Sequence, residues 1–174
     1  MHQPDPPLTP FNGGTHDTAG ADVPNIRAAA IADVPTIHHL LAIYASKGNL
    51  LPRTMSELYR HLRDFFVIEI DRKVVAIGAL EIFTEDLGEV RSLVVDAAYE
   101  RRGFGRLIVQ RIIAEARNIG LRRIMALTYV PEFFHKLGFK TVSMGSLPEK
   151  VWSVCVKCYK YNNCDEVAVL LELK

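Results

Sequence analysis

This chain of 174 residues has few cysteines, a net charge close to zero and no long apolar run. Three cysteines, an odd number, do not suggest the disulfide framework of a small secreted protein. A formal net charge of +1 leaves no excess of base to neutralise phosphates, which argues against a general nucleic-acid binder. No stretch approaches the roughly 18 consecutive apolar residues of a membrane span, and the N-terminus lacks the basic and apolar regions of a secretory signal. The composition predicts a cytoplasmic protein with neither a membrane nor a nucleic-acid partner.

Two regions differ in character along the chain. Residues 1–24 contain five of the nine prolines and no apolar periodicity, so we expect a disordered N-terminal tail there, with a docking peptide as the alternative. Residues 25–174 are patterned without a break or an internal repeat. With 49% hydrophobic and 24% charged residues in the chain, this part can form one compact domain without disulfides.

The hydrophobic periodicity of residues 25–174 alternates between strand and helix patterns. The order β-α-α-β-β-β-α-β-α-β-β predicts an α/β domain with a mixed, mostly antiparallel central sheet flanked by helices. We expect a capping box at Thr54 and Glu57, and an N-cap at Asp33. The expected strands cover residues 25–29, 65–70, 73–83, 89–95, 123–129, 151–155 and 166–173, and the expected helices cover 33–46, 54–63, 104–119 and 131–138.

The stretch from Leu93 to Ile108 carries the strongest functional signal. An apolar strand pattern ends in a polar turn, Gly103 and Gly105 follow one residue apart, and an amphipathic helix begins. Free N–H groups and the dipole at a helix N-terminus favour a phosphate there, and glycines let a ligand approach the backbone. A tight turn without a ligand is the alternative. Arginines surround this turn at positions 101, 102, 106 and 111.

The residues at this turn resemble those of the GCN5-related N-acetyltransferases (GNAT). The family motif [QR]-x-x-G-x-[GA] reads Glu100-Arg-Arg-Gly-Phe-Gly105 here, with Glu100 where Gln or Arg is usual, and the segment Phe133–Phe139 is also similar. The resemblance implies that the turn holds the pyrophosphate of acetyl-CoA, that the preceding strand pairs with the pantetheine arm, and that N–H groups of Val94 or Val95 stabilise the oxyanion. The implied cofactor-binding residues are Leu93, Val94, Val95, Arg101, Arg102, Gly103, Phe104, Gly105 and Arg106.

A narrower similarity is to the stand-alone N-acetylglutamate synthases. It rests on short blocks at Leu50–Thr54, Glu89–Leu93, Val130–Phe134 and Leu147–Trp152, followed by the cysteine-containing segments. The similarity implies acetylation of the α-amine of L-glutamate, the first step of arginine biosynthesis, by direct transfer in a ternary complex. Another small amine, amino acid or protein lysine as acceptor remains an alternative, as does a module that binds acetyl-CoA without turnover.

Acetyl transfer to an amine needs a group that removes a proton and a thiolate that can leave. Glu89 is the candidate general base, since family members that modify histones have a glutamate at a comparable place. A solvated carboxylate at the strand end is the alternative. Many family members have a tyrosine where Phe134 stands, and phenylalanine cannot donate a proton. Tyr129 could supply the hydroxyl instead, or form only a pocket wall.

A dicarboxylate acceptor requires fixed positive charge, which Arg provides through a fork that pairs with both carboxylate oxygens. Arg53 and Arg91 are the candidate substrate-binding residues, with Lys150 as a third, and surface salt bridges are the alternative. Because strand side chains alternate, we expect residues 89, 91, 93 and 95 to share one face.

Two further features have weaker support in the sequence. Cys155, Cys158 and Cys164 could bind zinc with His135 or Asp165 as a fourth ligand, although four Cys or His residues in two pairs are absent; reduced thiols are the alternative. Exposed sheet edges would permit a homodimer.

Overall fold

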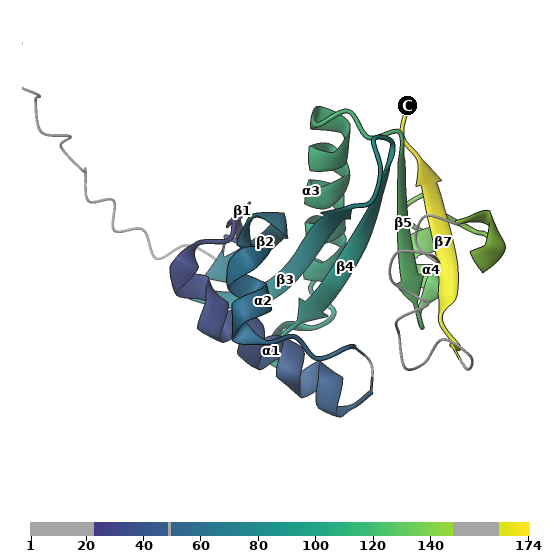
Figure 1. The fold of residues 1–174 in the computed structure, drawn as a ribbon. Helices are drawn as coiled ribbons and strands as arrows, with labels where there is room; N and C mark the ends of the chain where they lie inside the picture. Colours follow the sequence, from purple (N-terminus) through teal and green to yellow (C-terminus); the bar gives the residue numbers. More distant parts are fainter. Residues whose placement is uncertain (1–22, 49, 148–163) are drawn as a thin grey trace, which may run out of the picture.

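A mixed sheet with helices on both faces forms the framework. The computed structural model describes residues 23–48, 50–147 and 164–174, and in these ranges the sheet has seven strands (Figure 1). The strands are β1 (Asn25–Ala28), β2 (Phe65–Ile70), β3 (Lys73–Ile82), β4 (Leu87–Val95), β5 (Arg123–Thr128), β6 (Lys140–Thr141) and β7 (Val167–Glu172). Their order is β1-β2-β3-β4-β5-β7-β6, and all neighbours are antiparallel except the parallel pair β4 and β5.

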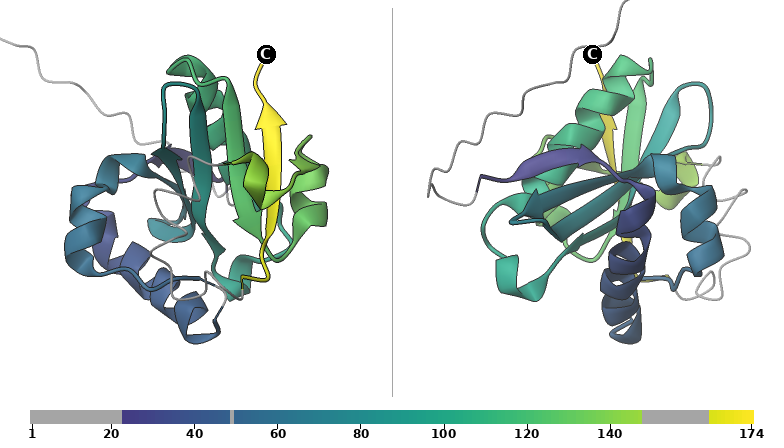
Figure 2. Two further views of the ribbon diagram at one scale, coloured as in Figure 1. Left: turned by 45° about the vertical axis from the view of Figure 1, so that its right-hand side comes forward. Right: turned by 90° about the vertical axis from the view of Figure 1, so that its left-hand side faces the viewer.

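Helices cover the two faces of this sheet. The α-helices are α1 (Val34–Ser46), α2 (Met55–Arg60), α3 (Phe104–Asn118) and α4 (Pro131–His135), and short 3-10 turns lie at 31–33, 62–64, 97–99 and 144–146. Helix α3 packs on one face, and α1 and α2 pack on the other (Figure 2). Among the described residues, no helix is long and apolar enough to span a bilayer.

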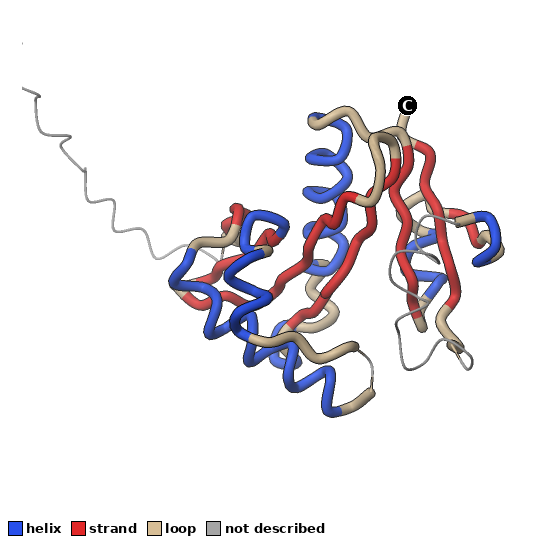
Figure 3. Tube along the Cα trace, in the orientation of Figure 1, coloured by secondary structure: helices blue, strands red, loops and turns tan. Residues whose placement is uncertain are grey.

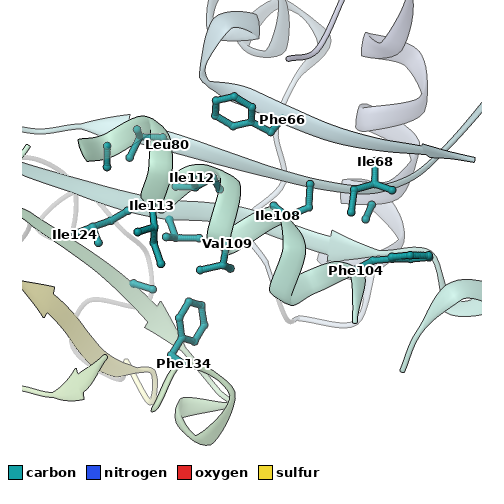
Figure 4. Packing of buried hydrophobic residues seen from close by; sticks show 14 of the residues in the cluster. Phe66, Ile68, Leu80, Phe104, Ile108, Val109, Ile112, Ile113, Ile124 and Phe134 are labelled. Atoms are coloured by element: carbon teal, nitrogen blue, oxygen red, sulfur yellow. The ribbon is translucent and has the colours of Figure 1, made fainter. Parts of the chain in front are cut away.

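The face under α3 holds the largest cluster of buried apolar side chains. Ile108 and Ile112 of α3 are fully buried there, together with apolar residues from β2 to β5 and Phe134 of α4 (Figure 4). Burying one such side chain stabilises the fold by about 1.5–3 kcal/mol. Gly78 of β3 allows the close approach of α3, because a Cβ there would lie 2.4 Å from Ile108 Cγ2. This packing holds the N-terminus of α3 in a fixed place beside β4.

The fold class and the order of the described elements confirm the sequence prediction. The capping box also forms: Thr54 Oγ1 accepts a hydrogen bond from the Glu57 N–H at 3.2 Å, and Glu57 Oε2 accepts from the Thr54 N–H at 2.7 Å. The second helix is shorter than expected, because the backbone of His61 leaves the helical region. Strand β6 was not predicted from its two residues, and the expected strand 151–155 and the tail at 1–22 lie outside the described residues.

Asp33 does not cap α1 as predicted. It stands at the N-cap position, but its side chain accepts hydrogen bonds from Arg27 at 2.6 and 3.0 Å and from the Ala30 N–H at 2.7 Å. The guanidinium of Arg27 donates to both carboxylate oxygens, and such a two-pronged bond between opposite charges is stronger than a single bond from a backbone N–H, so the carboxylate turns toward β1. These bonds tie the start of α1 to the edge of the sheet.

Candidate active site

Strands β4 and β5 start together and then separate (Figure 1). They pair at three positions, Leu87 with Arg123, Gly88 with Ile124 and Glu89 with Met125. Beyond Glu89, β4 continues to Val95 and β5 to Thr128 without further pairing between these described segments. An extended ligand that adds to a sheet edge would lie along this part of β4, and Glu89 lies at the point where the strands diverge.

A β-bulge in β4 changes which side chains share a face. Ala79 pairs with Arg91 but Ile77 pairs with Val94, so one residue is inserted opposite Gly78. Ser92 takes up the insertion with φ 54°. The expectation that residues 89, 91, 93 and 95 share one face is therefore wrong beyond Arg91, because a bulge shifts the alternation by one residue. Val94 packs with the α1 and α2 cluster, whereas Leu93 and Val95 pack against the α3 cluster.

The loop from β4 to α3, drawn in tan in Figure 3, contains two residues with left-handed backbone conformation. Arg101 and Gly103 adopt left-handed φ values of 61° and 84°, and Gly103 is the N-cap of α3. A Cβ on Gly103 would meet nothing within 4 Å, so the backbone angle rather than space favours glycine there. A Cβ on Gly105 would make ordinary contacts, at 3.6 Å from Phe133.

Main-chain donors are available at the same turn. Leu107 N–H donates to the Gly103 carbonyl at 3.1 Å, and the N–H groups before it in the first turn of α3 have no acceptor within the helix. Arg101, Arg102 and Arg106 are exposed around this start. Arg111 instead pairs with Glu115 at 3.0 Å on α3. The geometry and charge fit a phosphate ligand.

Tyr44 connects α1 to this turn. Its hydroxyl lies 2.8 Å from both the Val95 carbonyl oxygen and Glu100 Oε1. Burial, and then the neighbouring Glu100 carboxylate, raise the pKa of Tyr44 to about 12, so the phenol remains a neutral donor at physiological pH. Glu100, the residue that departs from the family motif, thus has a partner within the protein.

Four charged side chains meet on the face of the sheet that α1 and α2 cover. Glu89 is 3% exposed, and its Oε2 lies 3.5 Å from Nε of Arg91. Arg91 also forms an ion pair with Glu81 of β3, and an Arg53 guanidinium nitrogen lies 3.9 Å from Glu81 Oε2. The Arg53 and Arg91 side chains are only 17% and 18% exposed, which argues against ordinary surface salt bridges.

The structure therefore brings Glu89 and Arg91 of β4 together with Arg53, which precedes α2 in the sequence. Glu89 is not a solvated strand-end carboxylate, because β4 begins two residues earlier and the side chain is buried. Glu81 was missed by the sequence analysis. The available signal was a carboxylate within the apolar pattern of β3, and it gained meaning only from the cross-strand pairing of Glu81 with Glu89.

The two aromatic positions have different environments. Tyr129 follows the end of β5 and is 39% exposed. Phe134 is 4% exposed and lies edge-on to Phe133 and Phe139, with ring centroids 5.0 and 5.2 Å away. The residue at the usual tyrosine position is thus part of the core.

The structure leaves the zinc prediction largely untested. Lys150, Cys155 and Cys158 lie outside the described residues. Cys164 is exposed, with its thiol 3.8 Å from Glu166 Oε2, and His135 Nε2 lies 2.9 Å from Thr141 Oγ1. Within the ranges that the structure describes, no three His, Cys, Asp or Glu side chains are grouped to hold a metal.

Comparisons with known proteins agree on one family. Residues 36–139 match the model of the acetyltransferase (GNAT) family. The chain is 33% identical over 148 residues to an uncharacterized N-acetyltransferase of Chlorobaculum tepidum, covering 85% of this chain and 96% of that protein. It is 36% identical over 139 residues to the amino-acid acetyltransferase of Mycobacterium tuberculosis, covering 78% and 79% respectively.

Solved structures with 30% or more identity share the fold. A Mycobacterium tuberculosis protein in complex with CoA and NLQ matches with a TM-score of 0.74 and 32% identity, over 86% of this chain and 99% of that one. N-acetylglutamate synthase from Neisseria gonorrhoeae, complexed with coenzyme A and N-acetyl-glutamate, matches with a TM-score of 0.79 and 30% identity, over 90% of this chain but 36% of that one. The sequence matches and the shared fold show that the chain belongs to the GNAT family of acetyltransferases.

Proposed function

We propose that this protein transfers the acetyl group of acetyl-CoA directly to the α-amine of L-glutamate within a ternary complex. The observation that carries the proposal is the meeting of Glu89, Arg91 and Arg53 where β4 and β5 diverge. A base and two guanidinium groups suit an acceptor with one amine and two carboxylates. Relatives of this chain that are named amino-acid acetyltransferases support the same acceptor class.

The coenzyme half of the proposal rests on the turn and on the edge of β4 that diverges from β5. The turn at residues 100–105 would hold the pyrophosphate through N–H groups of α3, with charge from Arg101, Arg102 and Arg106. Residues 90–95 would pair with the pantetheine arm along about 20 Å of extended strand. This course leads from the phosphate turn toward Glu89, so that the thioester would reach the acceptor.

The geometry of β4 constrains the oxyanion donors. Val94 and Val95 lie five and six residues beyond Glu89, roughly 16–20 Å along a fully extended strand, so donors nearer to Glu89 suit a carbonyl that the same base serves. The bulge at Ser92 lies nearer, and a bulge leaves main-chain groups out of the ladder. We therefore place the thioester carbonyl at the bulge, while Val94 and Val95 bind the pantetheine arm.

In the proposed step, Glu89 takes a proton from the substrate ammonium, directly or through water. The amine nitrogen attacks the thioester carbon, and main-chain N–H groups stabilise the oxyanion. The nitrogen then loses its second proton, the C–S bond breaks, and coenzyme A leaves as the thiolate, which takes up a proton to give the free thiol. A thiol pKa near 8.5 makes coenzyme A a good leaving group. Tyr129 is the candidate donor of the proton that the departing thiolate takes up. An unchanged kcat in a Tyr129→Phe variant would leave Tyr129 only the role of a pocket wall. Lys150 is a further candidate for carboxylate binding.

A turnover assay with acetyl-CoA and a panel of amino acids tests the proposal. We expect release of free thiol and formation of N-acetyl-L-glutamate with L-glutamate as acceptor. Turnover only with other amino acids, small amines or a lysine peptide would assign a different acceptor. Binding of acetyl-CoA by calorimetry without turnover on any acceptor would indicate a non-catalytic module.

A further inference from the structure

Glu81 lies at the centre of the charged cluster. It pairs across the β3–β4 ladder with Glu89, so both carboxylates stand on the face that α1 and α2 cover. Its Oε2 is buried and is in ion-pair contact with the guanidinium groups of Arg91 and Arg53, although it accepts no hydrogen bond from the described residues. The same two arginines are the candidates for binding the carboxylates of the acceptor. The Glu81 carboxylate thus lies next to the two guanidinium groups, where a carboxylate of the substrate would bind.

The charges of the cluster show what this implies. Arg53 and Arg91 contribute two positive charges, and Glu81 and Glu89 contribute two negative charges, so these four side chains sum to zero. Glu89 is needed as the base in the proposed function. Glu81 is not needed for the chemistry, yet it neutralises part of the field that would attract a second substrate carboxylate.

We propose that Glu81 determines specificity by weakening the preference of the site for a dicarboxylate acceptor over the corresponding amide. This inference rests on the proposed function. L-glutamate and L-glutamine have nearly the same shape and differ by one negative charge at the end of the side chain. Their ratio of kcat/KM therefore measures the electrostatic field that Glu81 modifies, with little contribution from shape.

The Glu81→Gln variant removes the charge and keeps an oxygen that can accept a hydrogen bond from Arg91. We expect the kcat/KM ratio of glutamate to glutamine to rise about tenfold, through a lower KM for glutamate, as estimated for one unit charge several ångströms away in a partly screened site. The KM for acetyl-CoA is expected to stay the same. Both kcat/KM values are measured on the same enzyme sample, so a smaller folded fraction lowers both equally and leaves their ratio unchanged.

Two comparisons make the test specific. Glu115→Gln removes a carboxylate that pairs with Arg111 on α3, on the opposite face of the sheet, and should leave the ratio unchanged. In an Arg91→Ala background, adding Glu81→Gln should change the ratio less, because the two residues act through one ion pair. An unchanged or lower ratio in the single variant would overturn the inference. Absence of turnover by the unmodified enzyme with both acceptors would instead overturn the proposed function.

Discussion

The Tyr44 hydroxyl lies 2.8 Å from Glu100 Oε1, which links the C-terminal part of α1 to the phosphate-binding turn. The same hydroxyl is 2.8 Å from the Val95 carbonyl oxygen at the end of β4. The family motif has Gln or Arg at position 100, and the carboxylate that stands there in this chain accepts a hydrogen bond from Tyr44. The contact places a negative charge beside the site proposed for a pyrophosphate.

Replacing Glu100 by Gln should therefore strengthen the binding of acetyl-CoA. The amide oxygen can still accept the bond from Tyr44, while the repulsion between Glu100 and the pyrophosphate is lost. We expect the dissociation constant for coenzyme A to fall about threefold to tenfold at low salt, and less at high salt because the site is exposed to solvent. Calorimetric titration at two ionic strengths measures this change. Weaker binding at both would show that the carboxylate helps to hold the turn.

Glu89→Gln should reduce kcat by about 100-fold or more, with little change in the KM for acetyl-CoA. The amide cannot accept the ammonium proton, yet it keeps the volume of this buried side chain. Steady-state kinetics with both substrates varied gives the two constants separately. A rate close to that of the unmodified enzyme would remove Glu89 from the mechanism.

Arg53→Ala and Arg91→Ala should each raise the KM for glutamate far more than the KM for acetyl-CoA, by about tenfold or more. The Arg91 variant should also be less stable than the Arg53 variant, because it leaves Glu81 and Glu89 close together on one buried face. Kinetics and thermal unfolding of both variants separate the two effects. Equal effects on both KM values would contradict carboxylate recognition.

The local signals in the sequence predicted most of the framework. The capping box at Thr54 and the glycine turn before α3 involve only a few consecutive residues, so the residue types in each short segment are sufficient to indicate the structure. The bulge at Ser92 had no such signal, since serine rarely takes a positive φ and the insertion is set by the pairing with β3. The side-chain faces of β4 beyond Arg91 could not be predicted for this reason.

The candidate site was predicted only in part for a related reason. Arg53, Glu89 and Arg91 were identified from short sequence blocks. Glu81, which forms ion pairs with both arginines, is separated from Arg53 by a helix and a strand. Only the register of β3 and β4 shows that Glu81 and Glu89 are neighbours. Ion pairs between distant segments depend on the assembled sheet, and no spacing within one element indicates them.

The bonds of Asp33 predict a pH-dependent contribution to stability. Hydrogen bonds from Arg27 lower the pKa of Asp33 below its ordinary value of 3.8, burial opposes this effect, and the Ala30 N–H adds to it. A lowered pKa stabilises the folded state above the ordinary value, and this contribution is lost as the pH falls through the folded-state pKa. The unfolding free energies of the unmodified protein and Asp33→Asn should differ most near pH 7 and converge below pH 3.8. A pH-independent difference in urea titrations would contradict this assignment.

The two glycines of the turn should respond differently to alanine. Gly103 has a φ of 84°, so Gly103→Ala should cost about 1–2 kcal/mol of stability through backbone strain and should weaken binding of coenzyme A. Gly105 lies in the first turn of α3, and a Cβ there would be 3.6 Å from Phe133, so Gly105→Ala should keep or slightly raise stability.

Thermal unfolding of the two variants measures their stability, and calorimetric titration measures their dissociation constants for coenzyme A, so the effects on folding and on ligand binding are obtained separately. If the motif tolerates alanine at position 105, Gly105→Ala should keep the dissociation constant for coenzyme A within about twofold, less than 0.5 kcal/mol. A stable Gly105→Ala variant that binds coenzyme A much more weakly would mean that the ligand approaches the backbone at this residue. A Gly103→Ala variant with unchanged stability and binding would contradict the role assigned to the left-handed turn, because the strain at that angle is a property of any L side chain.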